Sequence, residues 1–325
     1  MNKVAITGAN GFIGSWLART LPEYGWEPVC LVRNSSDLSL LPENCIIRKV
    51  DYRDYHQLTV LLQDCSALIH GAALTRARKW SDFVTINIQF TEKLIELYQE
   101  IPSLKRFIFL SSQAAAGSAS SLKRPRTEQD DCQPLSAYGR SKMLAEKLIM
   151  EKCRKDYTII RPASVFGPGD KDFLVYFQLV KLHLALYPGI TDKYLNLIYV
   201  EDLCRLISSS LHNSNAANEI FFAAGKDIIS LKQFTNMVET VMDTFSNPVK
   251  IPCFFLKIIA LGAELWGNIS KQAVLLNRDK IREMCQNFWL IDNNKVTTLL
   301  DFKEKFTFQE ALQKTADWYK QKGWL

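Results

Sequence analysis

The chain has 325 residues, of which 47% are hydrophobic and 23% are charged, and its net charge is +6. This length is enough for a large core and is typical of one domain with a smaller lobe, and the composition is that of a globular protein. The charge is small for the length and forms no basic stripe, which argues against a nucleic-acid-binding surface.

The eight cysteines are scattered and form no C-x-x-C pair. Several lie in apolar runs, where a free thiol behaves as a small hydrophobe. We therefore expect a reducing compartment, with neither a disulfide framework nor a metal site. The first apolar run begins at Lys3 with no signal-peptide core ahead of it, so the expected location is cytoplasmic.

The first half of the chain alternates short β-rich apolar runs with amphipathic segments. This pattern is typical of a parallel sheet covered by helices on both faces. Strands are predicted near residues 3–7, 28–32, 45–50, 66–70, 105–111 and 157–161. Helices are predicted near residues 12–22, 54–63, 81–100 and 136–153. Residues 112–135 lack periodicity and are expected to form a functional loop, so the predicted fold class is α/β with a doubly wound parallel sheet.

After Pro162 the strand–helix alternation weakens. Further helices are predicted near residues 171–187, 201–211, 231–244, 254–266, 280–284 and 308–319, with one more strand at 219–222. The most hydrophobic stretch, residues 251–266, contains Lys257 and Glu264 and is too short and too charged to span a bilayer. We interpret it as a buried or pocket-covering helix, with a membrane-surface helix as the alternative.

Three glycines spaced as G-x-x-G-x-x-G lie between the first predicted strand and the first predicted helix, at Gly8, Gly11 and Gly14. Gly8 permits a tight turn, Gly11 lets backbone N–H groups approach a pyrophosphate, and Gly14 lets the helix pack against the strand. The helix N-terminus adds a partial positive charge. The motif predicts a Rossmann-type dinucleotide site; the alternative is a glycine-rich turn without a ligand.

The end of the second strand indicates which dinucleotide is bound. An acidic side chain there binds the ribose of NAD, whereas an arginine suits the 2′-phosphate of NADP. Arg33 follows this strand, which favours NADP as the cofactor; NAD remains possible, since Arg33 could be a surface residue and Asp37 could bind a ribose hydroxyl. Asp51 ends the third strand, where it could hydrogen-bond the adenine or cap the next helix.

A second pattern, Y-x-x-x-K, places Tyr138 and Lys142 on one face of a predicted helix. The preceding strand ends at Ser112, at the sheet edge where doubly wound folds bind ligands. A free phenol has a pKa of about 10, and we expect the Lys142 ammonium and a nicotinamide to lower it. Tyr138 would then exchange a proton with a substrate oxygen, and Ser112 would stabilise charge on that oxygen.

Six ordered motifs resemble the extended short-chain dehydrogenases/reductases of the NAD-dependent epimerase/dehydratase family. They lie at residues 7–14, 70–73, 107–112, 138–142, 161–170 and 198–203. The resemblance implies that Ser112, Tyr138 and Lys142 are the catalytic residues. It also implies a set of residues that line the cofactor: Gly8, Asn10, Gly11, Phe12, Ile13, Arg33, Asp51, Tyr52, Ala72, Ala73, Tyr138, Lys142, Pro162, Ala163 and Val165.

The same resemblance suggests substrate contacts from Gln113, Ser164, Phe166 and Tyr176. His70 is expected to order its loop, and Asn87 resembles a family asparagine near the nicotinamide or is a surface residue. We expect residues 1–165 to form an NAD(P)-binding Rossmann domain to which residues 196–224 return. Residues 166–195 and 225–325 are expected to form a mostly helical substrate-binding lobe.

Two uses of this family compete for the chain. Sugar-nucleotide members usually carry Asn where this chain has Ser164, and Arg-Asp ahead of the strand near residue 198, where this chain is neutral. Aromatic side chains are frequent in the second half, at Phe173, Tyr176, Phe177, Tyr187, Phe254, Phe255 and Trp266. The resemblance is to the subgroup described as dihydroflavonol-reductase-like or 3β-hydroxysteroid-dehydrogenase-like.

We therefore predict an NAD(P)-dependent oxidoreductase that reduces a carbonyl, or oxidises an alcohol, on a fairly apolar small molecule. The alternatives are a nucleotide-sugar epimerase or dehydratase and a non-catalytic cofactor-sensing protein. The expected partners are the small-molecule substrate and, by resemblance, a second copy of the chain bound through the helices near 81–100 and 136–153. Neither nucleic acid nor stable membrane insertion is expected.

Overall fold

The computed structural model describes the backbone of residues 1–270 and 277–325 and the side chains of residues 1–264 and 277–325. Its centre is a seven-stranded parallel sheet in the order β10–β6–β5–β4–β1–β2–β3. These strands are β1 (Asn2–Thr7), β2 (Trp26–Val32), β3 (Ile46–Lys49), β4 (Ala67–His70), β5 (Arg106–Leu110), β6 (Tyr157–Pro162) and β10 (Glu219–Ala223). The predicted doubly wound α/β fold is confirmed, and the fold is Rossmann-like.

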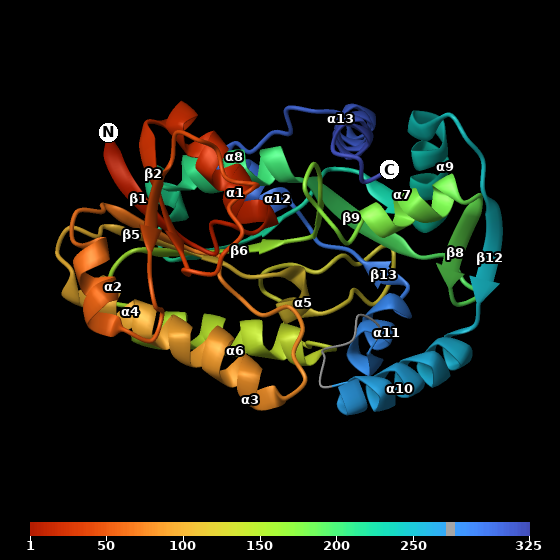
Figure 1. Ribbon diagram of the computed structural model, residues 1–325, viewed down its shortest axis with the longest axis horizontal. Coiled ribbons are helices and arrows are strands. Elements are labelled where there is room, and N and C mark those ends of the chain that lie inside the picture. Colours follow the sequence, from red (N-terminus) through yellow and green to blue (C-terminus); the bar gives the residue numbers. More distant parts are fainter. Residues whose placement is uncertain (271–276) are drawn as a thin grey trace.

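Helices cover both faces of this sheet (Figure 1). One face packs against α1 (Phe12–Thr20) and α8 (Val200–Ser210), and the other against α2 (Tyr55–Leu62), α4 (Phe90–Glu100) and α6 (Ala137–Lys152). Because successive strand side chains point to opposite faces, Ile6 and Ile108 belong to the first core and Ala5 and Phe107 to the second. Burial on both faces explains why these strands are continuous apolar runs in the sequence.

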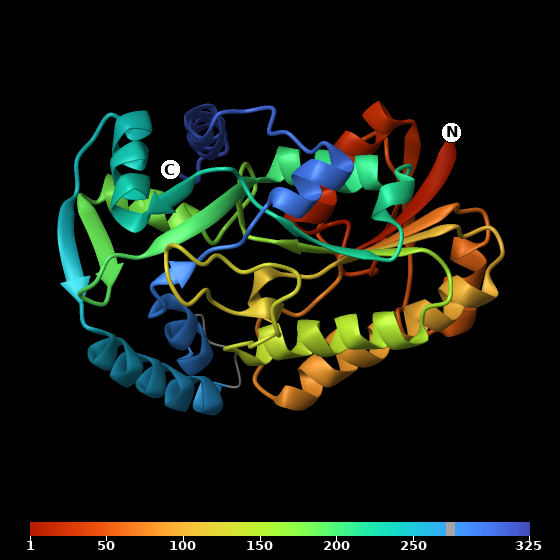
Figure 2. The same cartoon turned by 180° about the vertical axis from the view of Figure 1, so that it is seen from behind.

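A second group of elements lies beyond the carboxyl ends of the large sheet, and we call it the C-terminal lobe (Figures 1 and 2). It contains a four-stranded sheet and a two-stranded sheet. The strands are β7 (Ser164–Phe166), β9 (Tyr194–Tyr199), β11 (Ile228–Ser230) and β13 (Phe288–Trp289), with β8 (Leu184–Pro188) paired to β12 (Asn247–Ile251). Its helices are α7 (Leu174–Lys181), α9 (Leu231–Met242), α10 (Cys253–Ser270) and α11 (Arg278–Met284). The remaining helices are η1 (Leu21–Tyr24), η3 (Ser214–Ala216), α12 (Asn294–Leu300) and α13 (Phe308–Gln321).

Besides the strands of the C-terminal lobe, which were not predicted, three predicted segments take another form in the structure. The helix expected over 171–187 ends at Lys181, because the residues of β8 pair with β12 instead. The helix expected over 81–100 is divided into α3 (Trp80–Phe83), a π-helical stretch η2 (Val84–Gln89) and α4. The loop expected over 112–135 begins with a short helix, α5 (Gln113–Ala116).

The expectation that the cysteines form no disulfide is wrong for one pair, Cys253 and Cys285. These residues are 32 positions apart in sequence, and their Cα atoms are 6.1 Å apart. They meet because α10 and α11 pack together through Leu256, Ala260 and Ile281. The other six cysteines carry free thiols.

Over the described residues, the structure contains no helix with the length and apolarity that a bilayer crossing requires.

Candidate active site

The glycine motif forms the turn from β1 into α1. Gly8 has a φ of +73°, and a Cβ at this position would lie 2.7 Å from the Ala72 nitrogen. A Cβ at Gly14 would lie 2.2 Å from the Gly8 carbonyl oxygen, so the approach of α1 to the turn requires glycine. Gly11 is the N-cap of α1 and supplies no side-chain cap, which leaves the first N–H groups of the helix directed at an anion site. Asn10, Phe12 and Ile13 are partly exposed at the same turn.

The loop after β4 is held against this turn. The Thr7 hydroxyl accepts from the Ala72 N–H at 3.2 Å and contacts His70 Nδ1 at 2.7 Å. His70 Nε2 contacts the Thr91 hydroxyl at 2.9 Å. Burial, with a smaller effect from the Lys142 charge, holds the pKa of His70 well below its ordinary value. His70 is therefore neutral and orders the loop that carries Ala72 and Ala73.

Arg33 and Asp51 follow neighbouring strands, and both are exposed. Asp51 Oδ1 accepts from the Arg53 N–H at 3.0 Å. The α2 helix is capped instead by Asp54, which accepts from the Gln57 N–H at 2.9 Å. The capping alternative for Asp51 is therefore wrong, and its carboxylate lies at the rim of the sheet beside β2.

Tyr52 supports the glycine turn from the side of β2. Its hydroxyl donates to the Leu31 carbonyl at 2.7 Å, and its ring makes an edge contact with Phe90 at 5.1 Å between centroids. Burial raises the pKa of Tyr52 to about 12, although a hydrogen bond from the Gly8 backbone opposes the rise. Its phenol is thus engaged with the protein next to Gly8.

The three predicted catalytic residues converge at the carboxyl end of β5. Ser112 caps α5, and its Oγ accepts from the Ala114 N–H at 3.1 Å, which leaves the hydroxyl proton available to donate. The Ser112 side chain lies close enough to Tyr138 to lower the phenol pKa through a hydrogen bond. Lys142 is buried, and its Nζ donates to the Leu110 carbonyl at 2.7 Å.

Burial is the largest influence on the pKa of Tyr138 in the described structure. Burial raises the pKa of Tyr138 to about 12; the Ser112 hydrogen bond lowers it and the Glu283 charge raises it. Burial also lowers the pKa of Lys142, to about 7, with Glu146 opposing. Tyr138 therefore holds its proton at neutral pH, and its phenol is poised as an acid.

A buried ion pair lies on the same face of α6, one turn beyond Lys142. Glu146 accepts from Arg161 Nε at 2.9 Å and from Arg161 Nη2 at 2.7 Å, and it also accepts from the Ser111 hydroxyl. The two charged side chains are 1% and 3% exposed. Tyr138, Lys142 and Glu146 thus form one row at i, i+4 and i+8, and this row is fixed to β6 by Arg161.

Asn87 connects this helix to the loop after β4. Its amide donates to the Leu74 carbonyl at 2.9 Å and to Ser141 Oγ at 2.8 Å, and its oxygen accepts from the Leu74 N–H at 2.8 Å. Ser141 in turn donates to the Tyr138 carbonyl at 2.7 Å. Because Asn87 is buried, the alternative of a surface residue is wrong.

The residues predicted to contact the substrate lie in different environments. Gln113 is buried beside Ser112, and its Nε2 has no hydrogen-bond partner within the described residues, while Ser164 is exposed. Phe166 is 1% exposed and packs on Phe173, Tyr199 and Phe308, so its ring belongs to the core instead of a substrate surface.

Tyr176 packs edge-on against Phe234, with the ring centroids 5.7 Å apart. Pro162 and Ala163 are buried at the end of β6, and Val165 is partly buried in β7. The side chain of Trp266 lies outside the described residues.

Besides Glu146, the site contains a second carboxylate that the sequence patterns did not indicate. Glu283 of α11 acts on Tyr138 through its charge, and its Oε1 is buried without a hydrogen-bond partner in the described structure. The helix is docked by Asp279, which accepts from the Ala137 N–H at 2.7 Å. Burial raises the pKa of Glu283, with a hydrogen bond from Ser136 opposing. No local pattern marks this residue, because it lies more than 140 positions after Tyr138.

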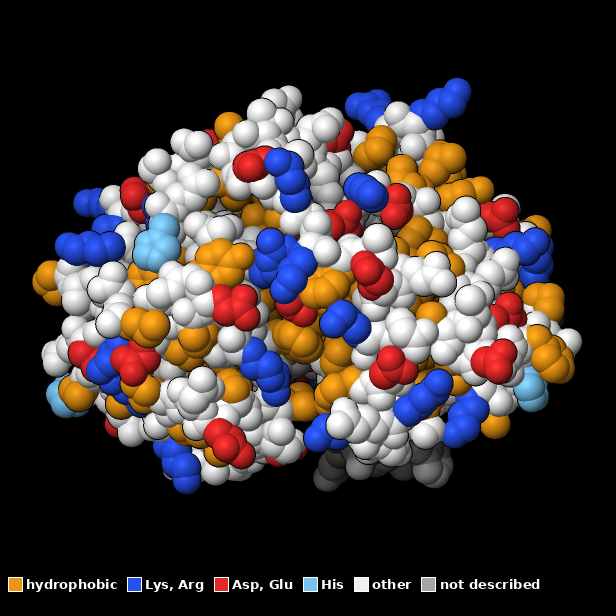
Figure 3. All heavy atoms as spheres, turned by 90° about the horizontal axis from the view of Figure 1, so that it is seen from above, with side chains coloured by type: hydrophobic (Ala, Val, Ile, Leu, Met, Phe, Trp, Pro, Cys, Tyr) orange, Lys and Arg blue, Asp and Glu red, His pale blue; other side chains and the backbone are white. Residues whose placement is uncertain are grey.

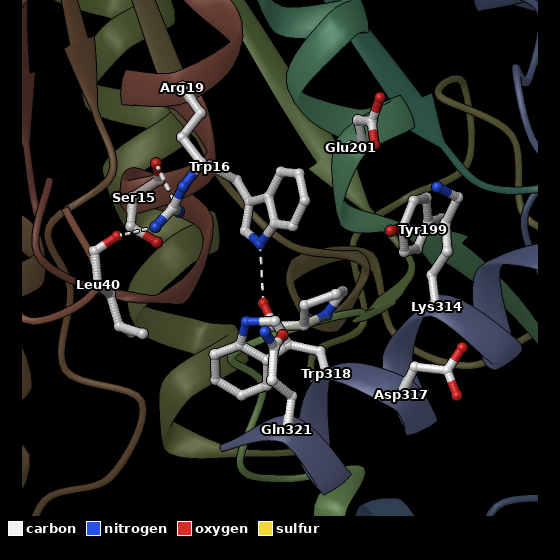
Figure 4. Close-up of a pocket in the computed structure, with 11 residues that line it drawn as sticks. Ser15, Trp16, Arg19, Leu40, Tyr199, Glu201, Lys314, Asp317, Trp318 and Gln321 are labelled. Carbon is white, nitrogen blue, oxygen red and sulfur yellow. Dashed lines mark hydrogen bonds between the residues drawn. The ribbon is translucent and has the colours of Figure 1, made fainter. Parts of the chain in front are cut away.

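A separate cavity of about 620 Å³ lies between α1, α8 and α13 (Figure 4). Trp16 donates there to the Pro168 carbonyl at 2.8 Å, and Arg19 donates to the Leu40 carbonyl. Its charged lining has both signs, with Arg19 and Lys314 beside Glu201 and Asp317, and Figure 3 shows both signs interspersed over the face seen from above. None of the predicted catalytic residues lines this cavity, so it is separate from the candidate site at the carboxyl end of β5.

The fold and its glycine turn define the Rossmann-like class of dinucleotide-binding proteins. The model of the NAD-dependent epimerase/dehydratase family matches residues 4–224. The chain belongs to this family.

Three similar proteins illustrate the range of the family. A UDP-glucose 4-epimerase of Vibrio cholerae is 26% identical over 96% of this chain and 94% of its own length. A ceramide reductase of Caulobacter vibrioides is 24% identical over 99% and 96%. The structure of DesIV, a dTDP-glucose 4,6-dehydratase from Streptomyces venezuelae with NAD bound, superposes with a TM-score of 0.80 at 20% identity, covering 99% of this chain and 98% of that one.

Proposed function

We propose that the protein is an NADP-dependent oxidoreductase that reduces a carbonyl group on an apolar small molecule, or oxidises the corresponding alcohol. The observation that carries this proposal is the convergence of Ser112, Tyr138 and Lys142 at the edge of the sheet, beside the glycine turn. This arrangement joins a proton donor to a site for a redox cofactor.

The residues present fit a dinucleotide. Gly8 and Gly14 allow the turn and α1 to pack closely on the backbone, and Gly11 at the N-terminus of α1 adds no side chain where a pyrophosphate would approach. Arg33 is exposed at the end of β2, where its guanidinium would bind a 2′-phosphate, and this supports NADP over NAD. When bound, the nicotinamide takes or supplies the hydride.

The chain's own residues handle the proton. Tyr138 is protonated at neutral pH, so it can donate to a carbonyl oxygen as that oxygen gains charge. The Ser112 hydroxyl can donate to the same oxygen. Lys142, fixed by Leu110, adds positive charge near the site when protonated.

An apolar substrate is supported by Ser164, which replaces the asparagine usual in sugar-nucleotide members. The similarity to a ceramide reductase over nearly the whole chain is in line with this substrate class. A nucleotide-sugar epimerase remains the second candidate, favoured by the similarity to the Vibrio cholerae enzyme.

The two candidates differ in substrate and in cofactor turnover. The purified protein is incubated with NADPH or NADH and a panel of long-chain and cyclic ketones, and separately with UDP-glucose. We expect loss of reduced nicotinamide absorbance with a ketone and NADPH, and no conversion of UDP-glucose. Epimerisation of UDP-glucose with tightly retained NAD, and no ketone reduction, would refute the proposal in favour of the second candidate.

A further inference from the structure

The α10 helix presents an apolar face to solvent. Its outward side chains are spaced at helical intervals and are between 48% and 67% exposed: Phe254, Phe255, Ile258, Ile259 and Leu261. Among the described side chains of this helix, Leu256 and Ala260 on the opposite side are buried, and they pack on Ile281 of α11. The expectation that this stretch is a buried or pocket-covering helix is therefore wrong for its outer half. Figures 1 and 2 both show α10 at the edge of the C-terminal lobe with α11 beside it.

This arrangement differs from an ordinary surface helix. A helix on the surface of a globular protein carries polar residues on its outer side, whereas α10 carries large apolar residues there. Single exposed apolar side chains are common, but five on one face of one helix indicate an interaction surface. Leaving them in water has a cost that burial against a partner would remove.

The exposed charges in the residues that lead into this helix and through its first half are basic, whereas its later carboxylate, Glu264, is bound to Arg278 at 2.7 Å. Between Asp243 and Glu264 the sequence has no carboxylate, and its charged side chains are Lys250 and Lys257, both exposed. A helix with an apolar face and flanking lysines is suited to the boundary between lipid headgroups and acyl chains, where anionic headgroups attract the lysines.

We propose that the exposed face of α10 docks on the surface of a lipid bilayer that contains anionic phospholipid. A second copy of this chain is the less suitable occupant. A symmetric interface would place the same patch on both sides, which brings Lys257 of one copy toward Lys257 of the other. The carboxylate Glu264 of the described part of the helix is already bound to Arg278 of its own chain.

Docking would place the active site close to the bilayer. The α11 helix is joined to α10 by the disulfide and by Leu256, Ala260 and Ile281. It is also joined to the start of α6 through Asp279 and through Arg282, which donates to the Leu135 carbonyl at 3.2 Å. These contacts form a short path from the lipid-facing helix to Tyr138. The consequence that the substrate enters from the lipid phase rests on the proposed function, whereas the docking itself does not.

Vesicle sedimentation tests the docking without cofactor or substrate, so its outcome is independent of the enzyme's reaction. The full chain is mixed with phosphatidylcholine vesicles that contain about one-third phosphatidylglycerol. We expect the wild-type protein to sediment with these vesicles and less with phosphatidylcholine alone. The double variant Phe254→Ser/Ile258→Ser should bind at least about tenfold more weakly. Lys257→Gln should lower binding to the anionic vesicles about fivefold.

Two further variants keep the test decisive. Phe255→Ser/Ile259→Ser changes the neighbouring row of the same face and should also weaken binding. Val60→Ser is the matched control, because Val60 is 52% exposed, the same as Ile258. Val60 lies on α2, one of the helices that cover the large sheet, and not on α10. Thermal unfolding verifies that each variant is folded. The proposal would be overturned if both folded double variants bound the vesicles as strongly as the wild-type protein. It would also be overturned if the wild-type protein did not bind vesicles but self-associated, and the double variants lost this self-association.

Discussion

The buried pair of Arg161 and Glu146 allows a quantitative test of how the site is held together. The side chains are 3% and 1% exposed and share two hydrogen bonds, of 2.9 and 2.7 Å. Glu146→Gln keeps the shape of the side chain but removes its charge, which leaves the guanidinium buried without a counter-ion. Removing one partner of such a pair costs about 3–5 kcal/mol. We therefore expect the free energy of unfolding to fall by about this amount.

Urea unfolding followed by circular dichroism measures the change. Glu92→Gln is the matched control, because Glu92 pairs with Lys152 on the surface and the two side chains are 32% and 50% exposed. An exposed pair contributes about 0–1 kcal/mol. If Glu146→Gln destabilised the protein no more than Glu92→Gln, the account of a buried pair fixing α6 to β6 would be refuted.

Three other predictions concern the cofactor and Lys142. Gly14→Ala places a Cβ 2.2 Å from the Gly8 carbonyl oxygen, so NADPH affinity measured by fluorescence titration should fall at least about tenfold. Wild-type affinity would contradict the assignment of the glycine turn as the cofactor site. Arg33→Asp should shift the ratio of kcat/KM values from NADPH toward NADH by about tenfold or more, and an unchanged ratio would remove the NADP assignment. Burial lowers the pKa of Lys142 to about 7 from its unfolded value of 10.5, so the unfolded chain binds more protons between these values and stability rises with pH there. Lys142→Met should reduce this rise in stability, measured by urea unfolding at about pH 7 and about pH 9. An unchanged difference in stability between the two pH values would contradict the lowered pKa of Lys142.

Much of the large sheet could be predicted from the sequence, because its strands are buried on both faces and their apolar runs stand out. The strands of the C-terminal lobe could not. Strand β13 has two residues, Phe288 and Trp289, and pairs with β9, almost a hundred positions earlier. The residues of β8 have a helix-like composition and become a strand through pairing with β12.

The candidate site, like the fold, could be predicted from the sequence only in part. Glycine spacing and the Tyr138–Lys142 interval are local patterns, so the sequence indicated them. The pKa of Tyr138 depends on burial and on Glu283, which arrives from α11, and neither follows from the helix that carries Tyr138. Glu146 was within reach of a local argument, since it continues the row of Tyr138 and Lys142 on α6, but its partner Arg161 lies on β6.

The central claim is that the Tyr138 phenol transfers the proton in a reaction driven by a bound nicotinamide. The most direct measurement is kcat for ketone reduction by Tyr138→Phe, with NADPH affinity and thermal unfolding measured on the same sample. Loss of general-acid catalysis lowers the rate by about 100-fold or more, and we expect this loss with NADPH affinity retained. Tyr157→Phe, which changes a tyrosine at the amino end of β6, opposite the carboxyl edge of the sheet, is the control and should keep most of the activity. A folded, NADPH-binding Tyr138→Phe enzyme that reduces the ketone at the wild-type rate would contradict the account.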